Sequence, residues 1–447
     1  MRRARPLDGA PLIRLLTIAA AAFLLRMTVR LESGEADFWE NGYTFLFDLA
    51  RSVAAGHGLT LDGHTPTVYR VPVYPLFLAA VTRGHQAFYS LVVAQSLVGA
   101  LTVLCAGLLT AEWFGSGAAL IAAAFAAIYP YYVVHDTALQ DTGLFTLITL
   151  VSVLLLMRAR RSMSAGMAGV EPPLGTLRTR RFNPAVVRAG WPLLAGVALA
   201  AAVLTRASIA LFALAAPLWL VWAADAGTPA RARVRAGLLC AAALAVGVAP
   251  WLVRSYIVAG APILQNDTGQ RLWDGNNPYT FTRYPIESID LSKADALEAM
   301  PANERAELAA AGADDVSFDR WFLDQAVRFM RDHPWLTVAN GFRKIGATFS
   351  ILPSPRRSLW PTLAYVLSYG PIMILGLFGM VSSWRSWRED SLIYWLFLSF
   401  ALLTALFFGH TSHRVFLDVY WMTFAASVIS HESSVVSRQS QSSVISR

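Results

Sequence analysis

The sequence has few charged residues and almost no cysteine. Only 15% of its 447 residues are charged and 55% are hydrophobic, whereas soluble proteins average about 25% charged residues. The two cysteines, Cys105 and Cys240, lie inside apolar runs at no disulfide or metal-ligand spacing, so we expect both to be small buried side chains. These features exclude a soluble domain and a scaffold held by disulfides.

The sequence instead contains many long apolar runs. A bilayer span needs about 20 apolar residues, so we expect an all-α polytopic membrane protein. The run 190–224 must form two spans, because one helix of that length would extend about 52 Å, well beyond the ~30 Å hydrocarbon core. The turn between these two spans falls at Thr205 and Arg206. The ten predicted spans are 11–30, 88–111, 117–134, 142–157, 190–204, 207–224, 236–254, 361–383, 392–409 and 414–430.

The arginines predict the orientation of these spans. Most of the net charge of +8 comes from segments on the side of the N-terminus, such as 158–189, which has seven arginines and one acid. Segment 255–334, on the other side, has thirteen acids and seven bases. By the positive-inside rule, the N- and C-termini are therefore cytoplasmic. This placement accounts for the basic charge without any nucleic-acid partner.

Two outward-facing segments are much longer than ordinary connections. The first is 31–87, and the second is 255–360, in which we expect surface helices. Within the second, 336–352 is amphipathic and is expected to be interfacial or re-entrant. We treat 1–430 as a single transmembrane domain and the serine-rich 431–447 as a disordered cytoplasmic tail.

Three acids, Glu35, Asp37 and Glu40, follow the first predicted span. Carboxylates at a membrane surface beside an apolar wall tend to have raised pKa values and can act as general bases. The alternative is a solvated acidic collar that helps to set the topology. The acid pattern alone leaves both interpretations open.

Arginines also occur at predicted outer ends of spans, against the positive-inside bias. Arg206, Arg254 and Arg414 are in such positions. A basic residue on this side favours a specific anionic partner, such as a lipid-linked phosphate. Ordinary anchoring at the interface is the alternative for each of them.

His135, Asp136 and Asp141 fill the predicted short outer loop between the third and fourth spans. A divalent ion could bridge such acids, but their spacing matches no motif of the His-Glu-x-x-His kind. The sequence therefore leaves a divalent metal possible but does not indicate one, and it makes no cofactor certain.

Several short segments on the outer side occur in an order that resembles a known family. They are Glu40 to Tyr43, Gly56-His57-Gly58, Tyr69 to Pro75, Leu204-Thr205-Arg206, Pro250 to Tyr256, Gly269 to Pro278, His333-Pro334 and His413-Arg414. Together they resemble polyprenyl-phosphate-sugar-dependent glycosyltransferases with the GT-C fold, of the family 39, dolichyl-phosphate-mannose protein mannosyltransferase and aminoarabinose transferase type. The resemblance extends over nearly the whole chain and implies a bacterial member.

This resemblance implies the catalytic acid. The family's Asp-Glu-x-x-Tyr pattern falls on residues 39–43, where Trp39 replaces the aspartate. Glu40 is then the matching acid that removes or orients the acceptor proton, with Asp37 as second choice and Glu35 as third.

The resemblance also implies residues that bind the donor. The lysine of the family's Lys-Pro-Pro-Leu segment corresponds to Arg70, whose planar fork suits a phosphate. With Arg206, Arg254 and Arg414, it makes up the predicted phosphate-binding set. Supporting or substrate-binding roles are implied for Tyr43, Tyr69, Tyr74, Asp141, Asn276, Asn277 and His413.

The sequence thus predicts an inverting glycosyltransferase. It would move a sugar from a polyprenyl-phosphate carrier to a lipid, polysaccharide or protein acceptor at the outer face of the bacterial cytoplasmic membrane. The alternatives are a polytopic transporter and a non-catalytic binder of lipid-linked saccharides. A transporter would carry charged residues in the span interiors, where the sequence has almost none apart from Asp418.

Overall fold

The fold is helical throughout the part of the chain that the computed structural model describes. No β-strand occurs in that part. The expected tail, 431–447, lies outside it. The described residues are 7, 9–165, 184–225, 227–312, 314–384 and 387–430.

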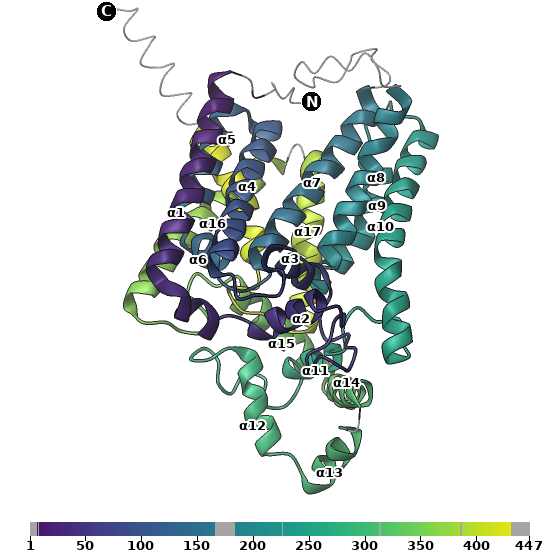
Figure 1. The fold of residues 1–447 in the computed structure, drawn as a ribbon. Helices are drawn as coiled ribbons and strands as arrows, with labels where there is room; N and C mark the ends of the chain where they lie inside the picture. Colours follow the sequence, from purple (N-terminus) through teal and green to yellow (C-terminus); the bar gives the residue numbers. More distant parts are fainter. Residues whose placement is uncertain are drawn as a thin grey trace, which may run out of the picture.

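Most of the helices lie side by side in one bundle (Figure 1). Each predicted span coincides with an apolar helix or with a pair of helices. Five helices, α1, α4, α7, α10 and α16, are long and apolar enough to cross a membrane, and the bent pair α5–α6 makes a sixth candidate. The other apolar helices are shorter, so a count of ten crossings stays a prediction. The bundle consists of α1 (Ala10–Glu40), α4 (Phe88–Phe114), α5 (Ser116–Ile128), α6 (Pro130–Thr137), α7 (Thr142–Ala165), α8 (Pro184–Val203), α9 (Ala210–Trp222), α10 (Ala230–Ala259), α16 (Leu359–Ser382), α17 (Trp387–Leu406) and a last helix (Val415–Ser430).

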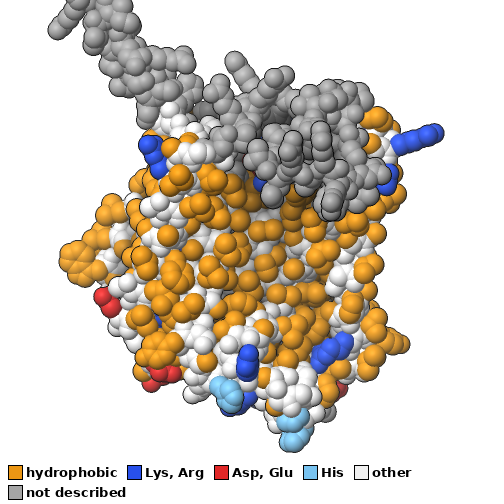
Figure 2. Space-filling model, turned by 45° about the horizontal axis from the view of Figure 1, so that its top comes forward, with side chains coloured by type: hydrophobic (Ala, Val, Ile, Leu, Met, Phe, Trp, Pro, Cys, Tyr) orange, Lys and Arg blue, Asp and Glu red, His pale blue; other side chains and the backbone are white. Residues whose placement is uncertain are grey.

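The two long segments lie together at one end of this bundle (Figure 1). The first residues of α1 and α10 lie at the opposite end. This division agrees with the two chemically distinct sides predicted from the arginines. Figure 2 shows hydrophobic side chains covering the face of the bundle between the ends, as a bilayer requires. The helices of the long segments are α2 (Thr44–Ala54), α3 (Val73–Thr82), α11 (Thr268–Asp274), α12 (Lys293–Glu298), α13 (Ala302–Ala311), α14 (Asp315–Asp332) and α15 (Pro334–Thr348).

The third predicted span is not one straight helix. Its two parts, α5 and α6, meet at an angle of 57°. Pro130 causes the break, because proline has no backbone N–H and disfavours a helical conformation in the residue before it, here the extended Tyr129. The Ala126 carbonyl thereby loses its helical donor, and Arg26 Nη2 donates to it instead at 3.2 Å. His135, which the sequence placed in a loop, lies on α6.

The first predicted span also continues further than expected. α1 runs to Glu40, with a single break at Gly34, where φ is 84° and glycine is favoured. The candidate acids therefore lie on a helical extension of the first span and not in an irregular loop. Their positions are fixed by helical geometry.

The interior of the bundle contains more charged residues than Asp418, the one that the sequence analysis named. Arg26 forms a buried ion pair with Asp136 at 2.7 Å, and Arg414 forms another with Asp418. Gly99 on α4 makes room for the first pair, since a Cβ there would collide with both the Arg26 and the Asp136 side chain. The first pair joins α1 to α6. The second links two residues one turn apart at the start of the last helix, and Arg414 also bonds to Tyr365 of α16. Both therefore contribute to packing and need no ligand.

Candidate active site

The candidate acids on the last turns of α1 differ in their partners. Asp37 accepts hydrogen bonds from Arg30 Nη1 at 2.6 Å and from Asn41 Nδ2 at 2.9 Å. Glu40 is exposed and has no hydrogen bond or ion pair with any described residue. An ion-paired carboxylate is a weaker base than a free one. Of the three candidate acids, Glu40 is therefore the one whose carboxylate no described residue engages.

Trp39 is the hydrogen-bond partner of Glu35, the third candidate acid. Its Nε1 donates to Glu35 Oε1 at 3.1 Å. Its ring packs edge-on against Phe38, at 5.0 Å between centroids, and against Phe47 of α2, at 4.9 Å. Trp39 thus anchors the end of α1 and gives Glu35 a partner.

A continuous set of contacts leads from the end of α1 towards Arg70. The Tyr43 backbone N–H donates to the Leu139 carbonyl at 2.9 Å. The Tyr43 ring lies 5.9 Å from that of Phe45, which lies 5.7 Å from that of Tyr69. The Arg70 guanidinium stacks over Tyr69 at 4.1 Å. Tyr43 and Tyr69 therefore support the position of Arg70.

Arg70 joins the two long segments through a buried acid. Its Nη1 lies 2.6 Å from Oδ2 of Asp267, which is almost fully buried. Asp267 also pairs with Arg271 at 3.1 Å, and Arg271 pairs with Asp274 at 3.1 Å. Burial raises the pKa of Asp274 to about 6, although Lys293 and Arg271 act in the opposite direction. Positive and negative groups thus alternate along this network.

A second ion pair lies where α7 and α8 meet. Arg206, in the turn after α8, bonds through Nε to Asp141 Oδ2 at 3.2 Å, and its Nη2 bonds to Oδ1. The same Nη2 donates to Thr142 Oγ1 at 3.0 Å. The predicted tight turn at Thr205 and Arg206 is confirmed. Asp141, directly before α7, orients Arg206.

Two histidines lie within electrostatic range of these arginines. The rings of His410 and His413 are 3.8 Å apart. Burial lowers the pKa of His410 to about 4, and Arg206 and Arg357 lower it further, against the effect of Asp290. Burial likewise holds the pKa of His413 well below its usual range, and nearby Arg206 and Arg271 add to the effect. Both imidazoles are therefore neutral at pH 7, and three arginines lie within electrostatic range of them.

Arg357 differs from the other arginines in this region. Its side chain is exposed, and within the described chain its guanidinium has no hydrogen bond and no ion pair. We call Arg70, Arg206, Arg271 and Arg357 the arginine cluster. No group of three or more His, Cys, Asp or Glu side chains among the described residues is arranged to hold a metal ion. The chemistry that the cluster offers is the binding of an anion.

Arg414, a predicted phosphate ligand, is engaged by protein groups. It is completely buried. Its Nε donates to the Thr348 carbonyl at 3.0 Å, its other nitrogens bond to Asp418 and Tyr365, and its plane stacks on Tyr369 at 3.3 Å. These partners occupy the guanidinium on its edges and its face. In this structure Arg414 stabilises the bundle.

Arg254 also has protein partners. Its Nη1 donates to the Thr67 carbonyl at 2.9 Å and its Nη2 to the Leu59 carbonyl at 3.2 Å. It thereby fixes the first long segment to the end of α10. Tyr74 is buried on α3, and its hydroxyl accepts a hydrogen bond from Gln95 at 3.2 Å.

The two asparagines of the second long segment hold a turn. Asn277 Nδ2 donates to the Trp273 carbonyl at 2.7 Å, and Asn276 Nδ2 donates to the Leu406 carbonyl at 2.7 Å. Lys344 of α15 donates Nζ to Asn276 Oδ1 at 3.0 Å and to the Ala405 carbonyl at 3.2 Å. Burial lowers the pKa of Lys344 to about 7. This lysine ties the loop after α11 to the end of α17.

Sequence reasoning missed Asp267, Arg271, Arg357 and His410. The criterion that selected Arg206, a base on the outer side of a span, would also have selected Arg357. Asp267 carried no such signal, because its partner Arg70 is 197 positions away in the sequence.

No family model and no curated protein sequence matches the chain. Solved structures do match. The oligosaccharyltransferase of Archaeoglobus fulgidus in the apo form is 14% identical over 96% of this chain, with a TM-score of 0.50. The same organism's oligosaccharyltransferase AglB, solved with an inhibitory peptide and a dolichol-phosphate, is 13% identical over 96% of this chain, with a TM-score of 0.49. The chain spans about half of each, 52%.

The likeness to the apo enzyme shows the fold. This chain has the GT-C fold of membrane glycosyltransferases, as the sequence predicted. At so low an identity the likeness carries no residue roles and no substrate. Those rest on the chemistry of the arginine cluster and of Glu40.

Proposed function

We propose that this chain is an inverting glycosyltransferase that uses a polyprenyl-phosphate-linked sugar as donor and acts at the outer face of the membrane. One observation carries the proposal: the arginine cluster lies at the same end of the bundle as the free carboxylate of Glu40. Inversion at an anomeric carbon needs a base on the face opposite the leaving group. The leaving phosphate needs cations that stabilise its charge.

The arginines of the cluster retain donors for a ligand. Arg70, Arg206 and Arg271 keep 21%, 23% and 30% of their side-chain surface exposed. Each uses only some of its five N–H groups on protein partners. Arg357 uses none on a described residue. A phosphate can therefore be bound while the ion pairs with Asp141 and Asp267 hold the arginines in place.

The charges of this network balance. Four arginines of the cluster face three acids, Asp141, Asp267 and Asp274. Asp319, which acts on Asp267 and Arg271, is a fourth acid, and Lys293 and Asp290 offset each other. The monophosphate donor of the proposal therefore rests on the family resemblance and not on a charge count.

Glu40 is our proposed base. It lies three residues before Tyr43, which is bonded to the segment that carries Asp141. Asp37 and Glu35 serve to orient the end of α1. In the reaction, the acceptor hydroxyl gives its proton to Glu40 as its oxygen bonds to the anomeric carbon. The bond from that carbon to the phosphate oxygen breaks, and polyprenyl phosphate leaves against the arginine cluster. The acceptor class, a lipid, a polysaccharide or a protein, stays a prediction.

The buried charges do not favour a transporter. Arg26 and Arg414 have carboxylate partners and further acceptors inside the bundle. A transport pathway would leave such groups open to a cargo.

The test uses purified full-length protein and a panel of short-chain polyprenyl-phosphate hexoses and pentoses, with envelope extract as acceptor. Polyprenyl phosphate is released whichever acceptor is used, so its appearance is followed by mass spectrometry. We expect release with at least one donor and a loss of at least about a hundredfold in Glu40→Gln. Donor binding without any release would support a non-catalytic binder and overturn the proposal.

A further inference from the structure

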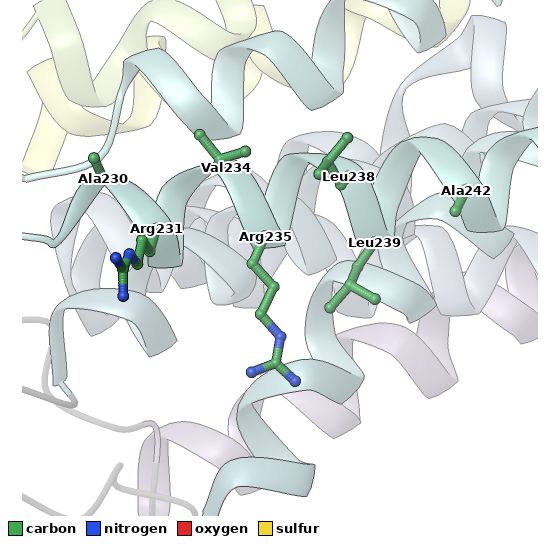
Figure 3. Close-up of a pocket in the computed structure, with 7 residues that line it drawn as sticks. All are labelled: Ala230, Arg231, Val234, Arg235, Leu238, Leu239 and Ala242. Atoms are coloured by element: carbon green, nitrogen blue, oxygen red, sulfur yellow. The ribbon is translucent and has the colours of Figure 1, made fainter.

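An open hollow along α10 is lined by that helix alone (Figure 3). Its lining residues lie between Ala230 and Ala242. A site that holds a ligand is concave and needs walls from more than one element. The second long segment offers such an arrangement, because α11 packs against α14 there (Figure 1).

The contact between α11 and α14 is closest at Gly269. A Cβ at Gly269 would lie 2.0 Å from the Asp319 carbonyl oxygen and 2.8 Å from the Leu323 backbone nitrogen, so only glycine fits there. One helical turn further along α11, the ring of Trp273 packs against that of Phe322 of α14, at 5.0 Å between centroids. α14 therefore fixes the position of α11.

Asp319 of α14 caps α11 from outside that helix. Its Oδ2 accepts a hydrogen bond from the Gly269 backbone N–H at 3.0 Å, and its Oδ1 accepts one from the Gln270 backbone N–H at 2.9 Å. Gly269 and Gln270 are the second and third residues of α11. An N-cap side chain ordinarily accepts from the N–H groups at these two positions. Asp319 thus supplies the cap, although it lies 50 positions from Gly269 in the sequence.

The residue at the N-cap position of α11 is Asp267, and its side chain forms no capping hydrogen bond. Aspartate is among the preferred N-cap residues, so this side chain would ordinarily accept from its own helix. Instead, its Oδ1 accepts from Gln265 Nε2 at 2.7 Å, and its Oδ2 accepts from Arg70 and Arg271 at 2.6 and 3.1 Å. Because Asp319 already occupies the capping N–H groups, the Asp267 carboxylate is free to hold both arginines.

We propose that Asp319 is a positioning residue of the donor site. By capping α11 it releases Asp267, which then orients Arg70 and Arg271. Within the described chain Asp319 forms no ion pair with either arginine, so its effect passes through Asp267. The inference rests on the proposed function, since it takes these arginines to be donor ligands. The link from Asp319 to Arg70 can nevertheless be tested without any turnover.

Hydrogen–deuterium exchange of the purified full-length protein tests this link. In Asp319→Ala, Asp267 is expected to return to its own helix and to release Arg70. Exchange should then become at least about threefold faster both in α11 and in segment 66–72, which contains Arg70. Faster exchange confined to α11 would overturn the release of Asp267.

The matched control is Asp314→Ala. Asp314 is also a capping aspartate, but it caps α14 itself, and it accepts from the backbone N–H groups of Val316 and Ser317 at 3.0 and 2.8 Å. Its loss should leave exchange in segment 66–72 unchanged. Equal acceleration there in Asp314→Ala and Asp319→Ala would mean general loosening of α14 and would overturn the link.

Steady-state kinetics with the polyprenyl-phosphate donor test the positioning role. Asp319→Ala should raise the donor KM about tenfold and change kcat less than about threefold. A merely structural role would lower the amount of active protein and leave KM unchanged. Asp319→Asn keeps one accepting oxygen, so it should raise KM only about threefold. In Asp314→Ala the KM should stay within about twofold of wild type.

A double variant shows whether the effect passes through Asp267. In an Asp267→Asn background, Asp319→Ala should raise the donor KM less than about twofold further, because the intermediate residue is already weakened. Fully multiplicative effects, or an unchanged KM in folded Asp319→Ala and Asp319→Asn, would overturn the positioning role. Exchange that responds as expected in a protein that turns over no donor would overturn the proposed function and leave the link from Asp319 to Arg70 in place. Melting temperatures show whether each variant is folded.

Discussion

Arg70 and Asp267 form an ion pair of 2.6 Å between the two long outer segments. Asp267 is buried, and Arg70 is one-fifth exposed. Asp267 thus fixes the position of Arg70, and part of the Arg70 guanidinium stays accessible to a ligand. The pair contributes both to assembly of the outer segments and to the charge of the arginine cluster.

Arg70→Ala should therefore weaken donor binding. Loss of hydrogen bonds to a charged phosphate should raise the apparent KM for the polyprenyl-phosphate donor about ten- to a hundredfold. Arg70→Lys, which keeps the charge but not the fork, should have an intermediate effect. Arg51→Ala is the matched control, because Arg51 lies in the same segment and pairs only with the exposed Asp48. An unchanged KM in Arg70→Ala, measured with folded protein, would remove Arg70 from the donor site.

Glu40→Gln should abolish turnover and leave donor affinity nearly unchanged. A general base contributes about 10² to 10⁴ in rate, so kcat should fall at least about a hundredfold. Asp37→Asn should cost much less, because its carboxylate is already bonded to Arg30 and Asn41. Asp48→Asn, an exposed acid of α2, serves as the control. Should Asp37→Asn lose activity while Glu40→Gln keeps it, Asp37 would be the base.

These assignments show what the sequence could and could not predict. The apolar segments and the turn at Arg206 followed from span length alone. The acids on α1 were found as a group, but only the structure shows that Asp37 and Glu35 have partners and that Glu40 has none among the described residues. Local patterns cannot show this, because hydrogen bonding depends on where each side chain points.

The roles of the arginines at span ends could not be distinguished from the sequence. Arg206 and Arg414 carry the same signal in the sequence, yet Arg206 is part of the arginine cluster and Arg414 is completely buried. The difference comes from Asp418, one helical turn further along, and from Tyr365 of α16, which together enclose Arg414. The break at Pro130 could be anticipated from proline chemistry, but its compensation by Arg26 could not, since 100 positions separate Arg26 from Ala126.

Arg414→Ala should act on stability and not on donor affinity. Removing one partner of a buried pair leaves Asp418 uncompensated, which typically costs about 3 to 5 kcal/mol. We expect a large fall in the melting temperature, which can be measured by light scattering or intrinsic fluorescence. Arg414→Ala/Asp418→Ala should recover part of that loss. Donor KM, measured on the folded fraction, should stay within about twofold of wild type. A tenfold rise in KM at full stability would restore Arg414 as a phosphate ligand.

Lys344 should make stability depend on pH. Its pKa is about 7 in the folded protein and near 10.4 in an unfolded chain. Between these values the unfolded state binds one more proton than the folded state, so stability rises with pH across the window. The cost of the buried lysine is fully present below about pH 7. Melting temperatures between pH 7 and 9 should therefore rise in wild type, with a smaller slope in Lys344→Met. Equal slopes would show that Lys344 is not the titrating group.

Asp274 should couple donor binding to pH. Its pKa is about 6, so protonation below that value removes one negative charge from beside Arg271. The arginine cluster then holds an additional net positive charge, and a donor whose own charge is constant should bind more tightly. We expect the apparent Kd for a polyprenyl-phosphate sugar to fall about threefold or more between pH 7 and pH 5. Asp274→Asn, which mimics the protonated acid, should bind tightly at both values. Asp295→Asn, an acid of α12 paired with Arg283, should keep the wild-type dependence. A wild-type Kd that rises as the pH falls would contradict the assigned charge balance, because protonation of any acid in this network must favour an anion.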